Sequence, residues 1–190
     1  MQTTGTSDRL RRTRGVTAVE VLVVLTLVAV VVAVAAPGMR DFLVRSSVAA
    51  GAEALVEALN TARMEALSRN AQVTICKSSN PHAAVPTCAG NTADWPEGWI
   101  IFVDQSAIGA LDSTDRVIAG GRADGRIETV VETPTRLASV TFNPLGPITG
   151  SPGTVEIRLT SALSDGTFER VICLSVLGRA SVTRSGVCQA

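Results

Sequence analysis

Residues 16–37 read VTAVEVLVVLTLVAVVVAVAAP, an apolar stretch in which Glu20 is the one charged residue. From Val16 to Ala36 the stretch spans about 32 Å as a helix at 1.5 Å per residue, which is enough to cross a bilayer. Four arginines lie between residues 9 and 14. Because cationic residues before an apolar segment stay in the cytoplasm, the stretch predicts one membrane span with its amino end inside.

Glu20 distinguishes two interpretations of this stretch. In a secretory signal peptide, the Ala-Val-Ala triplet at 33–35 would be the cleavage site and the segment would be removed. A carboxylate within an apolar span costs about 2.5–3.5 kcal/mol, and a signal peptide has no use for it. If cleavage instead follows Gly15, the new α-amine of Val16 can neutralise the Glu20 of a neighbouring helix in a low-dielectric bundle. The second interpretation retains the apolar helix.

A second helical segment is predicted beyond Pro37, where the missing N–H of proline should kink the helix. Apolar residues recur at helical spacing and charged residues occupy the opposite face, so residues 38–70 are predicted to form an amphipathic half. The apolar positions are Val48, Ala52, Leu55, Val56, Leu59, Ala62 and Ala66, and the charged positions are Arg45, Glu53, Glu57, Arg63 and Arg69.

The remaining residues, 71–190, carry short β-branched or aromatic runs separated by turn residues. Strands are predicted at 73–75, 99–103, 127–131, 140–142, 155–159 and 171–176, with a tight hairpin at 164–167 before the last of them. This length suits a single domain. The predicted fold class is α+β, in which a long amino-terminal helix packs on an antiparallel, β-rich head.

The composition leaves little material for catalysis, because the chain has one His and no Tyr. His82 lies in a proline-flanked loop, and no Ser/His/Asp or Cys/His set can be assembled around it. A calcium site formed by the aspartates at 104, 112, 115 and 124 is an alternative, but their spacing fits no calcium-binding loop. We therefore predict a protein that is not an enzyme and uses neither metal nor cofactor.

Four cysteines, Cys76, Cys88, Cys173 and Cys188, all lie in the part predicted to be outside the cytoplasm, where disulfides form. Four cysteines allow three connectivities. Proximity along the chain favours Cys76–Cys88 and Cys173–Cys188, each worth about 3 kcal/mol on the chain-entropy model. A zinc site is the alternative, but the sequence has no Cys-x-x-Cys.

Residues 14–24, RGVTAVEVLVV, resemble the class III leader of type IV pilins and type II secretion pseudopilins. The resemblance implies that prepilin peptidase cuts between Gly15 and Val16 and that Val16 is then N-methylated. It also assigns to Glu20 the role of the carboxylate that registers subunits during assembly, and to Pro37 the role of the residue that kinks the helix. The family usually begins its mature chain with Phe, and this sequence departs from that pattern at Val16.

Residues 95–104, WPEGWIIFVD, resemble a W-x-x-G-W-hydrophobic-F-x-D segment of the GspH/FimT group of minor pilins and pseudopilins. Residues 63–76 and the pair Gly178-Arg179 resemble the same group. The resemblance implies a pilin-like fold with a cleaved leader (1–15), a transmembrane and assembly helix (16–37), an amphipathic half (38–70) and a periplasmic head (71–190). We interpret Trp95 and Trp99 as core residues rather than as a ligand-stacking pair.

The function implied by this resemblance is that of a minor pilin in the tip or priming complex of a type IV pilus. Such a protein crosses the inner membrane once, with its head in the periplasm, and enters the filament by its amino-terminal helix. Its implied partners are other major and minor pilins or pseudopilins, prepilin peptidase and the inner-membrane assembly platform. The alternative in the same architecture is a minor pseudopilin that drives exoprotein secretion by a type II system.

A third alternative is a FimT-like pilin that binds DNA in natural transformation through a basic Gly-Arg-x-Arg segment. Residues 178–181 read GRAS, so the second Arg is missing, and the candidates are Arg179, Arg184 further along the chain, and Arg170, which we expect nearby in space. Removing residues 1–15 takes away four of 17 basic and one of 17 acidic residues, which leaves a net charge of −3. This average charge opposes phosphate binding.

Overall fold

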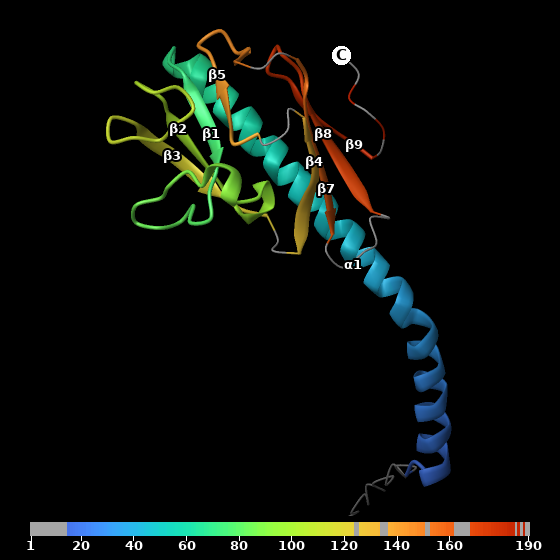
Figure 1. Ribbon diagram of the computed structural model, residues 1–190. Coiled ribbons are helices and arrows are strands. Elements are labelled where there is room, and N and C mark those ends of the chain that lie inside the picture. Colours follow the sequence, from blue (N-terminus) through green and yellow to red (C-terminus); the bar gives the residue numbers. More distant parts are fainter. Residues whose placement is uncertain are drawn as a thin grey trace, which may run out of the picture. The chain divides into compact units, whose positions relative to one another are not determined.

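The computed structural model of the chain describes residues 15–123, 126–133, 137–150, 153–161, 168–184, 186 and 188, leaving aside the side chains at 36, 37, 130 and 131. The chain divides into two compact units, with the boundary between Asp41 and Phe42. One long helix, α1 (Ala18–Arg69), begins in the first unit and ends in the second (Figure 1). The strands all belong to the second unit, and residues 71–190 of that unit are called the head.

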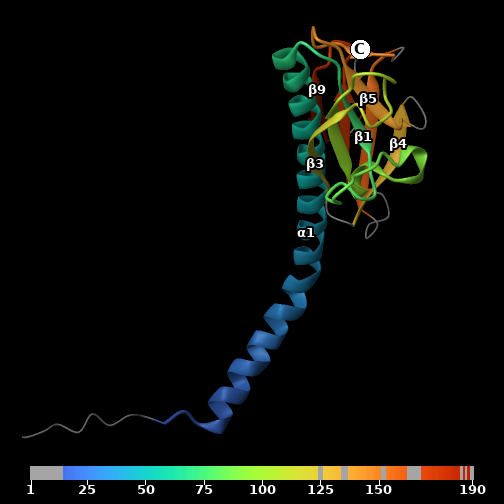
Figure 2. The ribbon, with the colours of Figure 1, turned by 90° about the vertical axis from the view of Figure 1, so that its left-hand side faces the viewer.

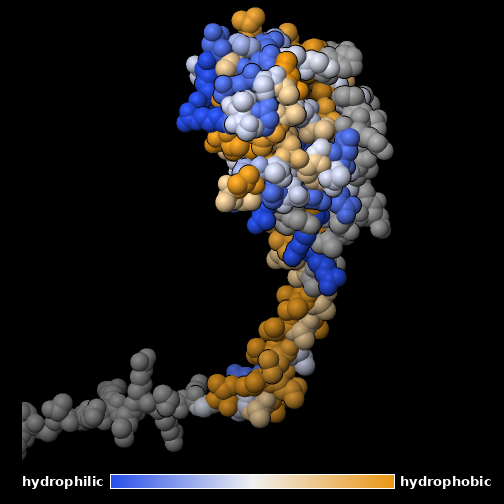
Figure 3. Space-filling view, turned by 60° about the vertical axis from the view of Figure 1, so that its left-hand side comes forward, coloured by the Kyte–Doolittle hydropathy of each residue, from blue (hydrophilic) through white to orange (hydrophobic). Residues whose placement is uncertain are grey.

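The amino-terminal half of α1 exposes its apolar side chains all round. Thr17 caps the helix, because its Oγ1 accepts a hydrogen bond from the Glu20 amide at 3.2 Å, so α1 begins at Ala18 rather than at Val16. Large apolar side chains from Val19 to Val34 are between 47% and 77% exposed. The segment Ala18–Ala35 has a mean hydropathy of 2.9 and is long and apolar enough to cross a membrane (Figure 3).

The second half of α1 buries one face against the head. All of the predicted stripe is buried except Val56, which is half-buried, while Ala58 is buried in addition. The helix approaches the sheet closely at Gly51, where an added Cβ would lie 2.3 Å from Cδ1 of Ile127. Small residues on this face therefore set the distance between helix and sheet.

The first sheet of the head has five strands in the order β3-β2-β1-β5-β6. Its strands are β1 (Val73–Lys77), β2 (Trp99–Val103), β3 (Arg116–Gly121), β5 (Ser139–Phe142) and β6 (Ile148–Thr149). All pairings are antiparallel, and the central strand β1 aligns Ile75 with Ile101 of β2 and Val140 of β5. Two short 3-10 helices, η1 (Gly90–Thr92) and η2 (Trp95–Glu97), lie between β1 and β2 in the chain.

The second sheet has four antiparallel strands in the order β4-β7-β8-β9. Its strands are β4 (Ile127–Thr133), β7 (Val155–Ser161), β8 (Glu169–Leu174) and β9 (Ala180–Thr183). Both sheets lie along one side of the second half of α1 (Figure 2), and one continuous core joins the three elements. Trp95 and Trp99 are buried in this core, as the sequence predicted.

The strand pattern read from the sequence is correct for six strands and misses three. The missed strands β3, β6 and β9 are short or lie at sheet edges, where polar and glycine residues weaken the alternating pattern. Strand β8 ends at Leu174 rather than at 176, because Gly178 N donates to Ser175 O at 2.8 Å and closes a turn into β9. The predicted hairpin at 164–167 lies outside the described residues. The α+β class, with a long helix on antiparallel sheets, is confirmed.

Candidate functional site

The predicted assembly residues lie at the beginning of α1. Val16 is 70% exposed, and Glu20 is exposed in the first helical turn, where a carboxylate complements the positive end of the helix dipole. Within residues 15–123 and the other described ranges, no ion pair involves Glu20. Residues 1–14 are outside the description, so cleavage after Gly15, methylation of Val16 and neutralisation of Glu20 stay predictions.

The helix continues through Pro37 in its backbone assignment. The side chain of Pro37 lies outside the described set, and the predicted kink stays a prediction. The boundary between the two units falls shortly after Pro37, between Asp41 and Phe42. The unit boundary is thus a few residues beyond the predicted end of the membrane segment.

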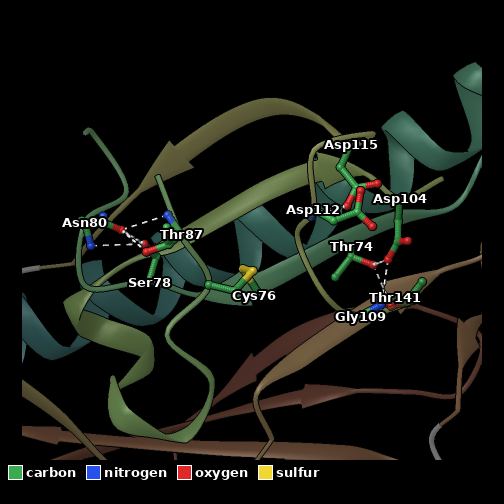
Figure 4. The surroundings of a disulfide bond; sticks show 11 residues. Thr74, Cys76, Ser78, Asn80, Thr87, Asp104, Gly109, Asp112, Asp115 and Thr141 are labelled. Carbon is green, nitrogen blue, oxygen red and sulfur yellow. Dashed lines mark hydrogen bonds between the residues drawn. A yellow bond between two sulfur atoms is a disulfide. The ribbon is translucent and has the colours of Figure 1, made fainter. Parts of the chain in front are cut away.

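The first disulfide joins Cys76 of β1 to Cys88 and closes the loop that follows β1 (Figure 4). Asn80 organises the same loop, because its Oδ1 accepts hydrogen bonds from the amide and the hydroxyl of Thr87 at 3.0 and 3.1 Å. Ala89 N then donates to Lys77 O at 2.8 Å. The disulfide therefore reinforces a loop that also has its own polar contacts.

The second disulfide joins Cys173 of β8 to Cys188 and holds Cys188 against the second sheet. Cys188 N donates to Glu156 Oε2 at 3.2 Å, and Arg158 Nη2 donates to Gly186 O at 3.1 Å. Arg158 also bonds Glu156, which lowers the pKa of that carboxyl. Glu156 therefore does not face solvent, although it alternates along β7 with the buried Val155 and Ile157.

The three candidate DNA-binding arginines do not form one cluster. Arg170 precedes Val171 and Arg184 follows its partner Thr183, so these two arginines flank the same end of the β8–β9 ladder. Arg179 lies at the other end, five residues from Arg184, or about 17 Å at 3.4 Å per residue. Arg170 therefore lies near Arg184 but not near Arg179, and DNA binding itself stays a prediction.

Asp104, which ends the W-x-x-G-W segment, is buried and links neighbouring strands. Its Oδ2 accepts hydrogen bonds from Thr74 Oγ1 and Gly109 N, both at 2.7 Å, and the Thr74 hydroxyl lies 2.7 Å from that of Thr141 (Figure 4). These contacts join β1, β5 and the loop after β2. Asp104 of the motif thus holds neighbouring segments of the head together.

The other aspartates shape an exposed loop after β2. Asp112 accepts hydrogen bonds from Ser106 and Thr114, and these bonds lower its pKa to about 2. Asp115 accepts from the amides of Gln105 and Asp112, both at 2.9 Å. Among the residues that the structure describes, no group of three His, Cys, Asp or Glu is arranged to hold a metal, and Asp124 lies outside them.

A buried ion pair between the two sheets was not found by sequence reasoning. Lys77 of β1 and Glu132 of β4 form an ion pair, with side chains 5% and 13% exposed. Glu132 Oε2 also accepts from Leu137 N at 3.1 Å, and the Lys77 ammonium lies 5.7 Å from the ring centroid of Trp95. A lysine at the end of a strand that is mostly apolar was the available signal, but its partner is more than 50 positions away along the chain.

Arg63, predicted on the solvated face of α1, instead packs against two turns. A Cβ added at Gly178 would lie 2.1 Å from Gly146 O and 3.2 Å from Arg63 Nε, and Gly178 has φ +77°. Glycine is needed at 178 both for this backbone conformation and for the close approach of the turns. Gly178 of the Gly178-Arg179 pair therefore has a structural explanation.

Comparison with known proteins gives a family match over most of the head. The sequence model of the family described as "Type II transport protein GspH" matches residues 51–178, which is more than half of the chain. No curated protein sequence matches the chain.

Two crystal structures of the type IV minor pilin FimU from Pseudomonas aeruginosa (strain PAO1) are similar to the chain. The structure in space group P21 has a TM-score of 0.56 and 19% identity, and the match covers 75% of this chain and 92% of that one. The structure in space group P65 has a TM-score of 0.52 and 19% identity, with coverage of 70% and 90%. At this identity the likeness establishes the fold: a long helix on antiparallel sheets, as in a minor pilin.

Proposed function

The chain belongs to the GspH family, and on this premise we propose that it is a minor pilin of a type IV pilus. The proposal places it in the tip or priming complex, joined to the filament through its amino-terminal helix. The exposed apolar half of α1, Ala18–Ala35, carries the proposal. These side chains need lipid or other apolar helices around them, because each Å² of apolar surface left in water costs about 25 cal/mol. A head with its own core leaves this half available for helix packing.

Processing would produce this helix from the precursor. In the proposal, prepilin peptidase removes residues 1–15, and the α-amine of Val16 is methylated. Residues 16–37 then hold the protein once across the inner membrane, residues 38–70 form the amphipathic half, and residues 71–190 form the periplasmic head. Other major and minor pilins join it at the inner-membrane assembly platform.

Glu20 would register each subunit on its neighbour. Its carboxylate is exposed in the first turn of the apolar helix and has no ion-pair partner among the described residues. In lipid or in a helical bundle such a charge costs about 2.5–3.5 kcal/mol. The terminal amine of a neighbouring subunit offsets this cost in one axial position only, which sets the register. Family and fold are structural in character, which fits a protein that is not an enzyme.

A second candidate function is that of a minor pseudopilin in a type II secretion system. The description of the matched family, a type II transport protein, favours it. Both functions use the same helix and the same head. Deletion of the gene separates them: loss of pili and of twitching supports the pilus, whereas loss of exoprotein secretion with pili intact supports the secretion system.

Replacement of Glu20 by alanine tests the proposal. We expect the mature chain to begin at Val16 and to remain in the membrane, but its incorporation into filaments to fall about tenfold or more, since a few kcal/mol of registration is lost. Terminal mass analysis and quantification of sheared filaments measure these outcomes. Glu97→Ala, which removes an exposed carboxylate of the head, is the matched control. Normal incorporation of the Glu20→Ala protein, or a native chain that begins at Ala36, contradicts the proposal.

A further inference from the structure

Strand β9 is an open edge of the second sheet (Figure 1). Its pairing with β8 aligns Cys173 with Ser181 and Ile172 with Val182. Ser175 N donates to Arg179 O at 3.0 Å, which identifies the hydrogen-bonded pair at the start of the ladder. Because such pairs alternate in antiparallel strands, Ser181 bonds β8, whereas the N–H and C=O groups of Ala180 and Val182 point away from it.

These outward groups have no partner in the described part of the head. No backbone hydrogen bond to the open side of β9 involves Ala180 or Val182 among those residues. The strand reads ASVT, without the charge or proline that usually protects an edge, and arginines stand only at its two ends. The edge therefore offers two donors and two acceptors at the spacing of a strand.

A groove of about 460 Å³ lies between this edge and the outer side of α1. Its apolar lining comes from Val56 and Met64 of α1 and Val182 of β9, and Met64 is 62% exposed. The remaining lining residues are Glu53, Glu57, Asn60, Thr61 and Glu65. Residues 53–65 extend about 18 Å along the helix, which matches about five residues of extended chain.

The groove is strongly acidic. Three glutamates line it and no Lys or Arg does. Glu65 is paired with Arg69, but Glu53 and Glu57 are exposed and form no ion pair within the described ranges. Apart from Asn60, Thr61 and the paired Glu65, a side chain that enters the groove from a strand added to β9 therefore meets either an apolar surface or an unpaired carboxylate. Lys or Arg in the bound segment would complement such an unpaired carboxylate.

We propose that the groove between β9 and α1 binds an extended segment of a partner protein, which adds a strand to the edge of β9. The segment has about five residues, with an apolar side chain over Val56 and Lys or Arg on either side of it, directed at Glu53 and Glu57. Main-chain hydrogen bonds to Ala180 and Val182 supply binding, and alternate side chains supply specificity, as in other cases of strand addition. The site uses residues of the second half of α1 and of the head, and does not depend on whether the protein serves a pilus or a secretion system.

A synthetic peptide of the sequence Lys-Thr-Val-Thr-Lys-Thr, blocked at both ends, tests the proposal on the full-length protein in detergent micelles. At saturating peptide we expect hydrogen exchange of the Ala180 and Val182 amides, followed by NMR, to slow about tenfold or more. The Ser181 amide, which already bonds β8, should not change. Absence of slowing at saturation, or equal slowing by the peptide with Glu in place of both Lys, overturns the proposal.

Two variants locate the binding. Val182→Pro removes an outward N–H without removing a bond to β8, as edge strands tolerate, and should abolish peptide-dependent protection of Ala180. Val182→Thr keeps the N–H and should retain the peptide-dependent protection of Ala180.

Glu53→Lys with Glu57→Lys leaves the strand intact and should weaken peptide binding about tenfold or more. Glu97→Lys, which makes a single reversal of charge elsewhere on the head, should not weaken it. This charge-reversal arm also decides the question if Val182→Pro unfolds. Protection that rises with protein concentration without peptide identifies a second copy as the occupant and overturns the proposal.

Discussion

The two halves of α1 differ in what surrounds their side chains rather than in their capacity to form a helix. Between Ala18 and Ala35 the large apolar side chains are exposed, whereas after Phe42 one face is buried against two sheets. The buried face uses small residues, such as Ala52, Ala62 and Ala66, which let the sheets approach the helix. Hydrophobicity alone therefore does not tell a packed helix from an unpacked one, but the size and the periodicity of its residues do.

The charges in the two regions repeat this contrast. Lys77 and Glu132 are buried in the head and compensate each other there. Glu20 has no ion-pair partner among the described residues, so its compensation is expected from another molecule. The buried pair of the head is thus compensated within the chain, whereas the charge of Glu20 is expected to be compensated only in an assembly.

Removal of one partner of the buried ion pair should give the largest effect on the head. We expect Lys77→Met to lower the free energy of unfolding by about 3–5 kcal/mol, because Glu132 is then a buried charge without a cation. Denaturant unfolding followed by tryptophan fluorescence measures it, since both tryptophans lie in the head core. The double variant with Glu132→Leu should recover most of the loss. If Lys77→Met leaves the free energy of unfolding unchanged, Lys77 does not compensate the charge of Glu132.

The same substitution in the two halves of α1 tests the comparison directly. Leu59 is fully buried, and Leu59→Ala should cost the head about 2–5 kcal/mol through lost packing and a cavity. Leu25 is 62% exposed, so Leu25→Ala should leave the unfolding of the head unchanged. Equal destabilisation by both variants, measured by the same fluorescence transition, would show that the two halves are one cooperative unit.

The disulfides should stabilise the head alone. Cys173→Ser with Cys188→Ser opens a link of 15 residues and should lower the free energy of unfolding by about 3 kcal/mol. The Cys76 and Cys88 pair should give a similar value in the same assay. Membrane retention should not change in either double variant. Mass mapping of the unreduced protein that finds four free thiols would remove the basis of this expectation.

Acid should lower the stability of the head by protonating its carboxylates, and this is the smallest of the four expected effects. The pKa of Asp112 falls from 3.8 to about 2 in the folded chain because Ser106 and Thr114 donate hydrogen bonds to it. The folded state then binds fewer protons than the unfolded one between these values, so the contribution of Asp112 is present above about pH 4 and lost toward pH 2. Asp112→Asn should slightly reduce the slope of the free energy of unfolding against pH over this interval. An NMR titration of the Asp112 carboxyl that gives a midpoint near 4 would contradict the assignment.

Local sequence patterns predicted much of the fold. The stripe from Val48 to Ala66, the strand Trp99–Val103 and the burial of both tryptophans follow from residue type and spacing. Edge strands such as β9 were missed because four residues with weak alternation carry little local signal. The partner of Lys77, the position of Arg63 beneath two turns and the separation of Arg179 from Arg170 depend on pairing between distant segments.

Residue chemistry and spacing along the chain were therefore sufficient for the long apolar helix with its single acid, the amphipathic half and the β-rich class of the head. The folded arrangement alone shows that Cys188 donates to the buried Glu156 and that β9 leaves an open edge beside three glutamates. The physical reason is the range of the interactions. Hydrophobic periodicity and helix capping act over a few residues, whereas sheet order and the pairing of buried charges join residues that are tens of positions apart.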